Sequence, residues 1–329
     1  MPLPTDDKIV GAAKEAIDVF KGLAGGPHPG FRPAHAKGIL LKGTFTPTAA
    51  AAALSKATHF QQASTPVLVR FSSSTGLPQI PDSDPNGNPR GIALRFLLPD
   101  SPSGRRQHTD IVAHSAPLFP AATPDETLAF FKAVAGAGSD PAAFSAFVAA
   151  HPAAQAFLQL PKPTPSAFAR ETFYSVTAFK LVNAAGKATY VRYRIEPVAG
   201  PDNLSDEVAR AQAADFLYAG VRAQVHDKKE PIQFRLVVQI GRDGDVTDNS
   251  TVRWADDGPD KRDEVELGRV SLDALFDESD DNGAADAAQQ KYLIFDPVPR
   301  VEGVEPSADP LLDFRAAIYL LSGRERRAA

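Results

Sequence analysis

The feature that most constrains the fold is a series of eight segments with strand-like patterns. They are residues 38–46, 65–76, 89–99, 109–114, 174–182, 189–197, 233–241 and 265–273. In 89–99, the apolar residues Ile92, Leu94 and Phe96 alternate with Ala93 and Arg95, which is the period of a half-buried strand. The helical segments come in blocks instead of following each strand, so the strands do not alternate with helices as they would in a parallel sheet. We therefore predict an α+β fold built on an antiparallel eight-stranded β-barrel with inserted and C-terminal helices.

Helical spacing and helix-start signals occur in seven further segments. They are residues 5–23, 47–60, 123–136, 140–150, 151–160, 204–225 and a last segment that begins after Asp309. In the last helix we predict Asp309 as the N-cap and Gly323 just beyond the end. The polar stretch 277–290 is predicted to be a surface loop. We expect a helical N-terminal arm, residues 1–31, and one domain, residues 32–329.

Composition excludes several classes of function. The formal net charge is −5, which argues against a nucleic-acid partner. No apolar run is long enough to span a membrane, and the charged first twenty residues do not resemble a signal peptide, so we expect a cytoplasmic protein. The chain has no Cys, and its one Met is Met1. This composition excludes disulfides, thiolate ligation of a metal and iron–sulfur clusters.

Near the C-terminus, an arginine and a tyrosine are placed to interact. Arg315 and Tyr319 are four residues apart, so they share a helix face with Leu311 and Leu312. A permanent cation beside a tyrosine favours the tyrosinate form, which is a ligand for ferric iron. An ordinary amphipathic helix that buries the leucines and the tyrosine and exposes the arginine also explains the pattern.

Two earlier segments carry further candidate residues. His35 lies in a stretch bounded by Pro and Gly, three residues after Arg32, and strand alternation puts Arg70 and Ser72 on one face. A buried arginine requires a partner because an unpaired charge inside a protein is costly. Each feature alone also fits an ordinary role, an exposed loop histidine or an arginine paired with a buried carboxylate.

Six stretches taken together resemble the catalase family, and specifically the short catalase-related peroxidases. They are "FRPAHAKG", "TPVLVRFSSSTG", "DPNGNPRGIALRFL", "TDIVAHSAPLF", "FKLVNAAGKATYVRYRIEP" and "FDPVPRVEGVEPSADPLLDFRAAIY". They occur in the family's order from about Arg32 to the C-terminus. The resemblance implies a catalase-like barrel that binds haem b (iron protoporphyrin IX).

The resemblance also implies a role for individual residues. His35 matches the distal histidine and Ser72 the serine that hydrogen-bonds it, while Tyr319 matches the axial ligand of the iron and Arg315 the arginine that stabilises its phenolate. The other residues assigned to the cofactor are Arg32, Arg70 and Arg326 for the haem propionates, Phe119 beside the distal face, and Leu311 on the helix of the axial tyrosine.

The sequence departs from the family's pattern at two residues. His114 stands where the family usually has a distal asparagine, and Thr177 stands where large catalases have a histidine that supports the proximal arginine. A histidine at position 114 is either a half-buried structural residue or a second hydrogen-bond donor or acid/base. The chain also has no counterpart of the long arm and C-terminal segments that enclose the channel of full-length catalases, so we expect a more open site.

These departures favour a peroxidase over a catalase. The implied reaction reduces hydrogen peroxide or organic peroxides with a small organic electron donor through a ferryl intermediate, with weak or no catalase activity. The expected partners are the peroxide and the donor, and the chain is expected to be a monomer or a homodimer. Neither the donor nor a nicotinamide cofactor is readable from the sequence.

Three other functions stay open from the sequence. The first is a small haem catalase that disproportionates hydrogen peroxide, and the second is a catalase-related enzyme that rearranges fatty-acid hydroperoxides. The third is a haem carrier without turnover, against which His35 and Ser72 argue because a carrier has no use for a distal base. An ordinary antiparallel barrel explains the strands but not the ordered set of motifs.

Overall fold

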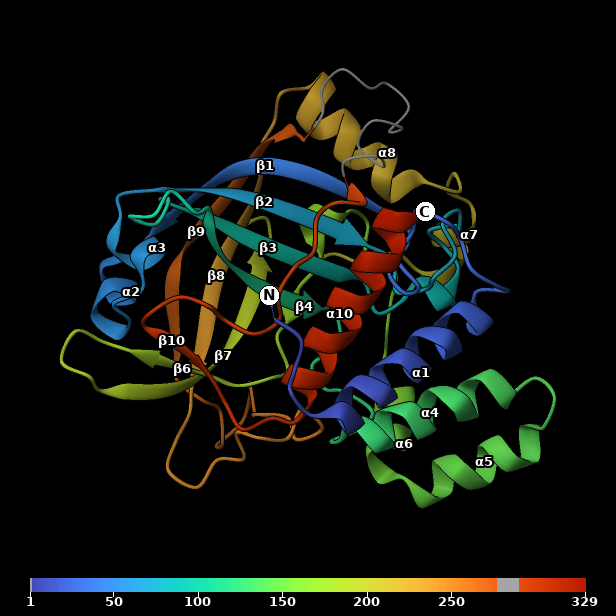
Figure 1. Ribbon diagram of the computed structural model, residues 1–329. Coiled ribbons are helices and arrows are strands. Elements are labelled where there is room, and N and C mark those ends of the chain that lie inside the picture. Colours follow the sequence, from blue (N-terminus) through green and yellow to red (C-terminus); the bar gives the residue numbers. More distant parts are fainter. Residues whose placement is uncertain (1, 277–289) are drawn as a thin grey trace.

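The computed structural model describes residues 2–276 and 290–329, and an antiparallel β-barrel lies at its centre (Figure 1). The strands of the barrel are β1 (Gly38–Pro47), β2 (Thr65–Ser72), β3 (Gly91–Leu98), β4 (Gln107–His114), β5 (Phe173–Tyr174), β7 (Ala188–Pro197), β8 (Ile232–Ile240) and β9 (Glu264–Leu275). In the described chain they pair in the order β7-β5-β4-β3-β2-β1-β9-β8, and the β7–β8 pairing closes the ring. The predicted fold class is confirmed. Of the predicted loop 277–290, all but Gln290 lies outside the described residues.

One predicted strand is divided in two. The segment 174–182 forms β5 and β6 (Phe179–Val182), and both pair with β7, while β10 (Val304–Pro306) adds to the free side of β6. The predicted hairpin is confirmed, since Val182 pairs with Ala188. Between β5 and β6 the chain buries Thr177, whose Oγ1 accepts a hydrogen bond of 3.5 Å from Arg315. The interruption therefore brings a polar side chain to the C-terminal helix.

Strand alternation separates the barrel core from the outer surface that carries the candidate residues. Phe71, Ile92 and Ala113 face inward and belong to the main apolar cluster. Each fully buried Phe or Ile contributes about 1.5–3 kcal/mol relative to exposure. The residues adjacent to these, Ser72, Gly91 and His114, face outward; Ser72 pairs with Gly91, and Gly91 pairs with His114.

Helices cover the outer face of the barrel. They are α1 (Asp7–Leu23), α2 (Ala49–Leu54), α3 (Thr58–Gln61), α4 (Pro124–Gly136), α5 (Pro141–Ala150), α6 (Pro152–Gln159), α7 (Asp206–Arg210), α8 (Phe216–Arg222) and α10 (Leu311–Ala328). Single turns of 3-10 helix occur at Pro85–Gly87 and Phe168–Arg170, and a π-helical turn at Ala223–Asp227 follows α8. In Figure 1, α1 lies beside α10, and the two helices pack against each other. None of the described helices is both long and apolar enough to cross a membrane.

Two predicted helices are each broken by side-chain hydrogen bonds. Within 47–60, Ser55 is extended, and its hydroxyl donates to the carbonyl of Gly303 (2.7 Å) and accepts from the amide of Ala57 (3.1 Å). Within 204–225, the amide of Leu217 donates to the buried carboxylate of Asp82 (2.8 Å), which begins α8 as a separate helix. Both breaks depend on partners distant in sequence.

A buried ion pair and a glycine fix the position of α10. Arg95 binds Asp110 through two hydrogen bonds of 2.7 and 2.8 Å, and the amide of Asp296 donates to the same carboxylate (2.6 Å). The prediction that Gly323 follows the end of α10 is wrong, because the helix continues to Ala328. A Cβ at position 323 would lie 2.4 Å from the Cδ1 of Ile294, so this glycine permits close packing rather than ending the helix.

We expect Gly323→Ala to lose most of the helix-propensity gain of about 1 kcal/mol, because the new methyl group overlaps the end of the Ile294 side chain, which must shift to make room. Gly11→Ala in α1 is the matched control, since nothing lies within 4 Å of the Cβ it would add. The control should gain up to about 1 kcal/mol from helix propensity. Urea unfolding of both variants measures the difference, and equal stabilisation of both would contradict this packing.

Candidate active site

His35 is held over a gap in the outer face of the barrel. Its Nδ1 shares a hydrogen bond of 3.0 Å with the hydroxyl of Ser72, and its backbone has a positive φ of 58°, with the amide donating to Ser74. A Cβ at Gly91 would lie 2.8 Å from that Nδ1 and 2.7 Å from the Ser72 oxygen. Any other residue at position 91 would displace the imidazole. The absence of a side chain at Gly91 therefore leaves the space that His35 occupies.

His114 lies on the other side of Gly91 in the same row across the strands. Its Nδ1 accepts a hydrogen bond of 3.2 Å from the amide of Ala116, and its ring centroid lies 6.3 Å from that of Phe119. Because Nδ1 accepts, a neutral His114 carries its proton on Nε2 and presents a hydrogen-bond donor.

Both imidazoles are neutral at pH 7. Burial lowers the pKa of His35 to about 3, and the positive charges of Arg70 and Arg32 lower it further. Burial, followed by the charge of Arg315, lowers the pKa of His114 to about 3. A pair of neutral imidazoles can divide one proton transfer between an acceptor and a donor.

The face of α10 that carries Arg315 and Tyr319 brings the charge of Arg315 close to His35 and His114. The Cζ of Arg315 lies 5.9 Å from the ring centroid of Tyr319, as four-residue spacing on a helix requires. The charge of Arg315 acts on both His35 and His114, so α10 presents this arginine to the histidine pair. Tyr319 is half-buried, and its hydroxyl has no hydrogen-bond partner among the described residues.

Two residues support Arg315: Thr177, which the resemblance had placed beside the proximal arginine, and Asp309, to which the sequence motifs gave no role in the site. Thr177 bonds Arg315 directly, and Asp309 is buried beside it, with a carboxylate oxygen that accepts from the amide of Leu311 (2.9 Å). Burial raises the pKa of Asp309, and the Leu311 amide and the charge of Arg315 oppose that rise. The structure gives Pro310 as the N-cap of α10, so the N-cap prediction for Asp309 is off by one residue, and the sequence did not reveal that this carboxylate lies near Arg315.

Three arginines from distant parts of the chain gather at one edge of the site. Arg32 and Arg326 both donate to the carbonyl of Leu293 at 3.0 Å, and Arg70 donates to Gln290 and to the carbonyl of His35. Arg326 is only 4% exposed and forms no ion pair with a described carboxylate. Burial and the charge of Arg70 lower the pKa of Arg326 to about 10.

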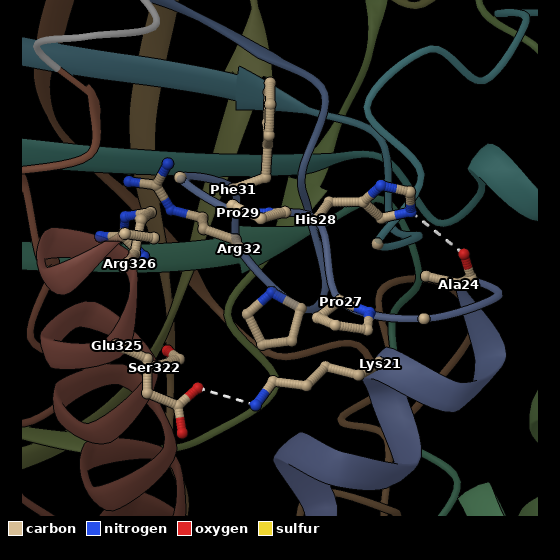
Figure 2. Close-up of a pocket in the computed structure, with 15 residues that line it drawn as sticks. Lys21, Ala24, Pro27, His28, Pro29, Phe31, Arg32, Ser322, Glu325 and Arg326 are labelled. Atoms are coloured by element: carbon tan, nitrogen blue, oxygen red, sulfur yellow. Dashed lines mark hydrogen bonds and ion pairs between the residues drawn. The ribbon is translucent and has the colours of Figure 1, made fainter.

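A cavity of about 290 Å³ adjoins these arginines (Figure 2). It lies between the end of α1, the segment 26–33 and the end of α10, with Arg32 and Arg326 in its wall. An ion pair of 2.9 Å between Lys21 and Glu325 joins α1 to α10 at its edge. The cavity therefore opens the arginine edge of the site, not the space between His35 and Tyr319.

The remaining two predicted residues lie in the helical layer. Leu311 is 2% exposed and belongs to an apolar cluster with Ala13 and Leu128, formed by α1, α4 and α10. Phe119 packs against that cluster as well as near His114. The structure thus gathers the histidines, the serine and the arginines, and places Leu311 where α10 meets the other helices.

Comparison with known proteins identifies the family. A family profile described as catalase matches residues 30–329, and the chain belongs to the catalase family. It is 33% identical to a catalase-related peroxidase of Mycolicibacterium paratuberculosis, over 95% of this chain and 94% of the relative. It is 31% identical to a catalase-related peroxidase of Synechococcus elongatus, over 92% of this chain and 85% of the relative.

Solved structures agree on the fold. A fungal catalase superposes with a TM-score of 0.76 at 21% identity, over 91% of this chain and 59% of that chain. Catalase A of Saccharomyces cerevisiae gives a TM-score of 0.73 at 21% identity, over 91% of this chain and 62% of that chain. The chain therefore shares the fold of these proteins and spans about three fifths of their length.

Catalases are typically haem proteins, and the residues of this site fit that group. A tyrosine hydroxyl without a partner in the described chain is a suitable iron ligand, and the buried, carboxylate-free Arg326 fits an anionic substituent. The gap at Gly91 accommodates the neutral imidazole of His35 beside Ser72, where it could act as a base. Within the described residues, no cluster of three or more His, Cys, Asp or Glu side chains offers an alternative metal site.

The buried histidines predict that stability falls in acid. Burial also lowers the pKa of His59 to about 3, and this ring lies between Phe60 (4.0 Å) and Phe96 (4.3 Å) with its Nδ1 unpaired. A histidine with a folded pKa below its unfolded value takes up its proton only on unfolding, so its contribution to stability is lost as pH falls from 6.5 towards 3.

His59→Phe should flatten this dependence by about 1.4 kcal/mol per pH unit between roughly pH 5.5 and 3.5, because one proton fewer is taken up on unfolding. Urea unfolding of apoprotein at several pH values measures the slope. An unchanged slope would mean that His59 is already protonated in the folded protein.

Proposed function

We propose that this protein is a haem-dependent peroxidase that reduces hydrogen peroxide or organic peroxides with a small organic electron donor. The observation that carries the proposal is the hydrogen-bonded His35–Ser72 pair over Gly91, within reach of the charge of Arg315, which lies one helical turn from Tyr319 on α10. The relatives named catalase-related peroxidases match nearly the full length of this chain and support the same reaction.

Tyr319 would hold the iron of a bound haem, and Arg32, Arg70 and Arg326 would bind its carboxylates; the group would supply a redox-active iron for reaction with peroxide. His35 acts as the base. Its Nδ1–H donates to Ser72, which leaves Nε2 free to take the peroxide proton and to return it to the departing oxygen. General acid–base catalysis of this kind is typically worth about 10²–10⁴-fold.

His114 complements this base as a fixed donor. The amide of Ala116 holds the proton of His114 on Nε2, so the side chain orients the peroxide towards His35 and does not compete for its proton. An asparagine amide would supply the same donor. The histidine therefore preserves donation at a position where the family usually has asparagine.

We expect His114→Leu to slow the reaction of the haem-loaded protein with peroxide about 10²-fold, as the loss of one oriented donor commonly does. His114→Asn should stay within a few-fold of the wild type. Nitrogen-15 NMR of the histidine-labelled protein should show His114 protonated on Nε2. Proton occupancy on its Nδ1, or an unaffected leucine variant, would contradict the donor role.

The electron donor could approach the site through the cavity beside Arg32 and Arg326. Arg32 and Arg326 line its wall, and Phe31, which is 41% exposed, lies at its rim. A reductant that transfers single electrons needs only to approach the edge of the cofactor, so an opening here suits a peroxidase.

The test mixes haem-loaded protein with peroxide in a stopped-flow spectrometer, first alone and then with a phenol or aromatic amine. A peroxidase gives an oxidised species that persists until the donor discharges it, with little oxygen release. Tyr319→Phe should change the resting spectrum, since it removes the proposed iron ligand.

The rival functions give different outcomes in the same experiment. Rapid oxygen release without a donor identifies a small catalase. Conversion of a fatty-acid hydroperoxide without oxidation of any electron donor identifies a rearranging enzyme, and haem uptake without any peroxide reaction identifies a carrier. A Tyr319→Phe variant with an unchanged spectrum would overturn the proposed ligand.

A further inference from the structure

The backbone of His35 is held in an uncommon conformation. Its φ of 58° lies in the left-handed region, which residues with a side chain seldom adopt. Such a conformation persists only where the surrounding contacts fix it. The amide of His35 donates to the carbonyl of Ser74, and Arg70 donates to the carbonyls of His35 (3.0 Å) and Ala36 (3.1 Å). The chain that follows must be fixed as well, because it could otherwise relax and carry the histidine with it.

Lys37, two residues after His35, is anchored through its side chain. Its ammonium group donates to the carboxylate of Asp82 (2.7 Å) and lies 4.7 Å from the ring centroid of Tyr218. Asp82 is fully buried and also accepts from the amide of Leu217 in α8 (2.8 Å). Helix α8 therefore approaches the segment that follows His35 with both its backbone and the side chain of Tyr218.

The carbonyl of Lys37 accepts from two donors. One is the amide of Ser73 (3.2 Å), and the other is the hydroxyl of Tyr218 (3.2 Å). The hydroxyls of Ser73 and Tyr218 are themselves 3.0 Å apart. Ser73 directly follows Ser72, the hydrogen-bond partner of His35. Tyr218 therefore joins the strand that carries this partner to the segment that carries the histidine.

Arg90 fixes the direction of these hydrogen bonds. A guanidinium only donates, so the Ser73 oxygen accepts from Arg90 (2.7 Å). A carbonyl only accepts, so the Tyr218 hydroxyl donates to Lys37, and the Ser73 hydroxyl donates to Tyr218. Burial raises the pKa of Tyr218 to about 12, so this hydroxyl keeps its proton at neutral pH and the series of hydrogen bonds stays complete.

We propose that Tyr218 is a positioning residue for His35: by holding the Lys37 carbonyl, its hydroxyl keeps the histidine backbone in the left-handed conformation. That conformation places the imidazole against Ser72. The inference rests on the proposed function, in which His35 is the base. The ring of Tyr218 belongs to the apolar core and packs edge-on against Phe168 (5.1 Å between centroids), so it acts through the backbone and not on the reacting atoms.

Removal of the Tyr218 hydroxyl should displace the base. The Lys37 carbonyl loses one of its two donors, and the buried Ser73 hydroxyl loses its acceptor. The segment from His35 to Lys37 can then relax away from Ser72. Because small misplacements of a catalytic group are costly in rate, we expect Tyr218→Phe to slow the reaction of the haem-loaded protein with peroxide about tenfold.

Tyr193→Phe is the matched control. Tyr193 is 3% exposed and belongs to the same core cluster, and its hydroxyl has no hydrogen-bond partner in residues 2–276 and 290–329. This variant removes the same atom from the core without breaking the series of hydrogen bonds, so it should react like the wild type. Ser73→Ala breaks the series at its neighbouring member and should resemble Tyr218→Phe. The double variant should be little slower than either, because both changes interrupt one network.

NMR of the full-length, haem-free protein with nitrogen-15-labelled histidine reports on His35 itself, and His35→Gln identifies its signal. In the wild type and Tyr193→Phe, the neutral ring should carry its proton on Nδ1, bonded to Ser72. In Tyr218→Phe and Ser73→Ala, both tautomers should be present. The pKa of His35, about 3 in the wild type, should rise in these two variants because a displaced ring is less buried.

The inference is overturned if Tyr218→Phe keeps the wild-type tautomer, pKa and rate, if Tyr193→Phe changes them equally, or if the effects of Tyr218→Phe and Ser73→Ala add in full. Should Tyr218→Phe not fold, Ser73→Ala decides by the same criteria. The NMR measurement needs neither haem nor peroxide, so it still tests the positioning of His35 if the protein proves not to be a peroxidase. A working peroxidase in which Tyr218→Phe leaves His35 unmoved rejects this inference alone.

Discussion

The register of three strands is the constraint on which the site depends. Ser72, Gly91 and His114 meet in one row on the outer face of the barrel only because β2, β3 and β4 pair as they do. A shift of one residue in β3 would put Arg90 or Ile92 beside Ser72 and reverse every side chain of the strand. The inward alternation of Phe71, Ile92 and Ala113 opposes that shift, so the apolar core fixes the polar site outside it.

The second half of the site depends on how α10 is attached to that barrel. The Arg95–Asp110 pair holds the amide of Asp296, and Gly323 lets α10 lie against Ile294. These contacts orient the Arg315–Tyr319 stripe towards the histidine pair. Residues more than two hundred positions apart therefore form one site because a buried ion pair and a missing methyl group fix two elements against each other.

Much of the site could be predicted where the signal is local. Alternation placed Arg70 and Ser72 on one face, and four-residue spacing placed Arg315 beside Tyr319, as the structure has them. The predictions that failed, and the role of Gly91 that the sequence did not show, concern positions whose contacts are distant in sequence. The role of Gly323 is set by Ile294, the break at Ser55 by Gly303, and the position of Gly91 by His35. A glycine within an alternating strand is a signal of close approach, but the sequence does not name what approaches.

The carbonyl of Leu293, which accepts from both Arg32 and Arg326, affects how these arginines would bind an anion. Arg32 and Arg326 both donate a hydrogen bond to this oxygen, and Arg70 donates one to the side chain of Gln290. An arriving carboxylate would compete with the protein's own backbone for the same guanidinium groups. Binding of an anion to these arginines would therefore break their hydrogen bonds to residues 290–293. The free energy of anion binding includes the cost of breaking those bonds.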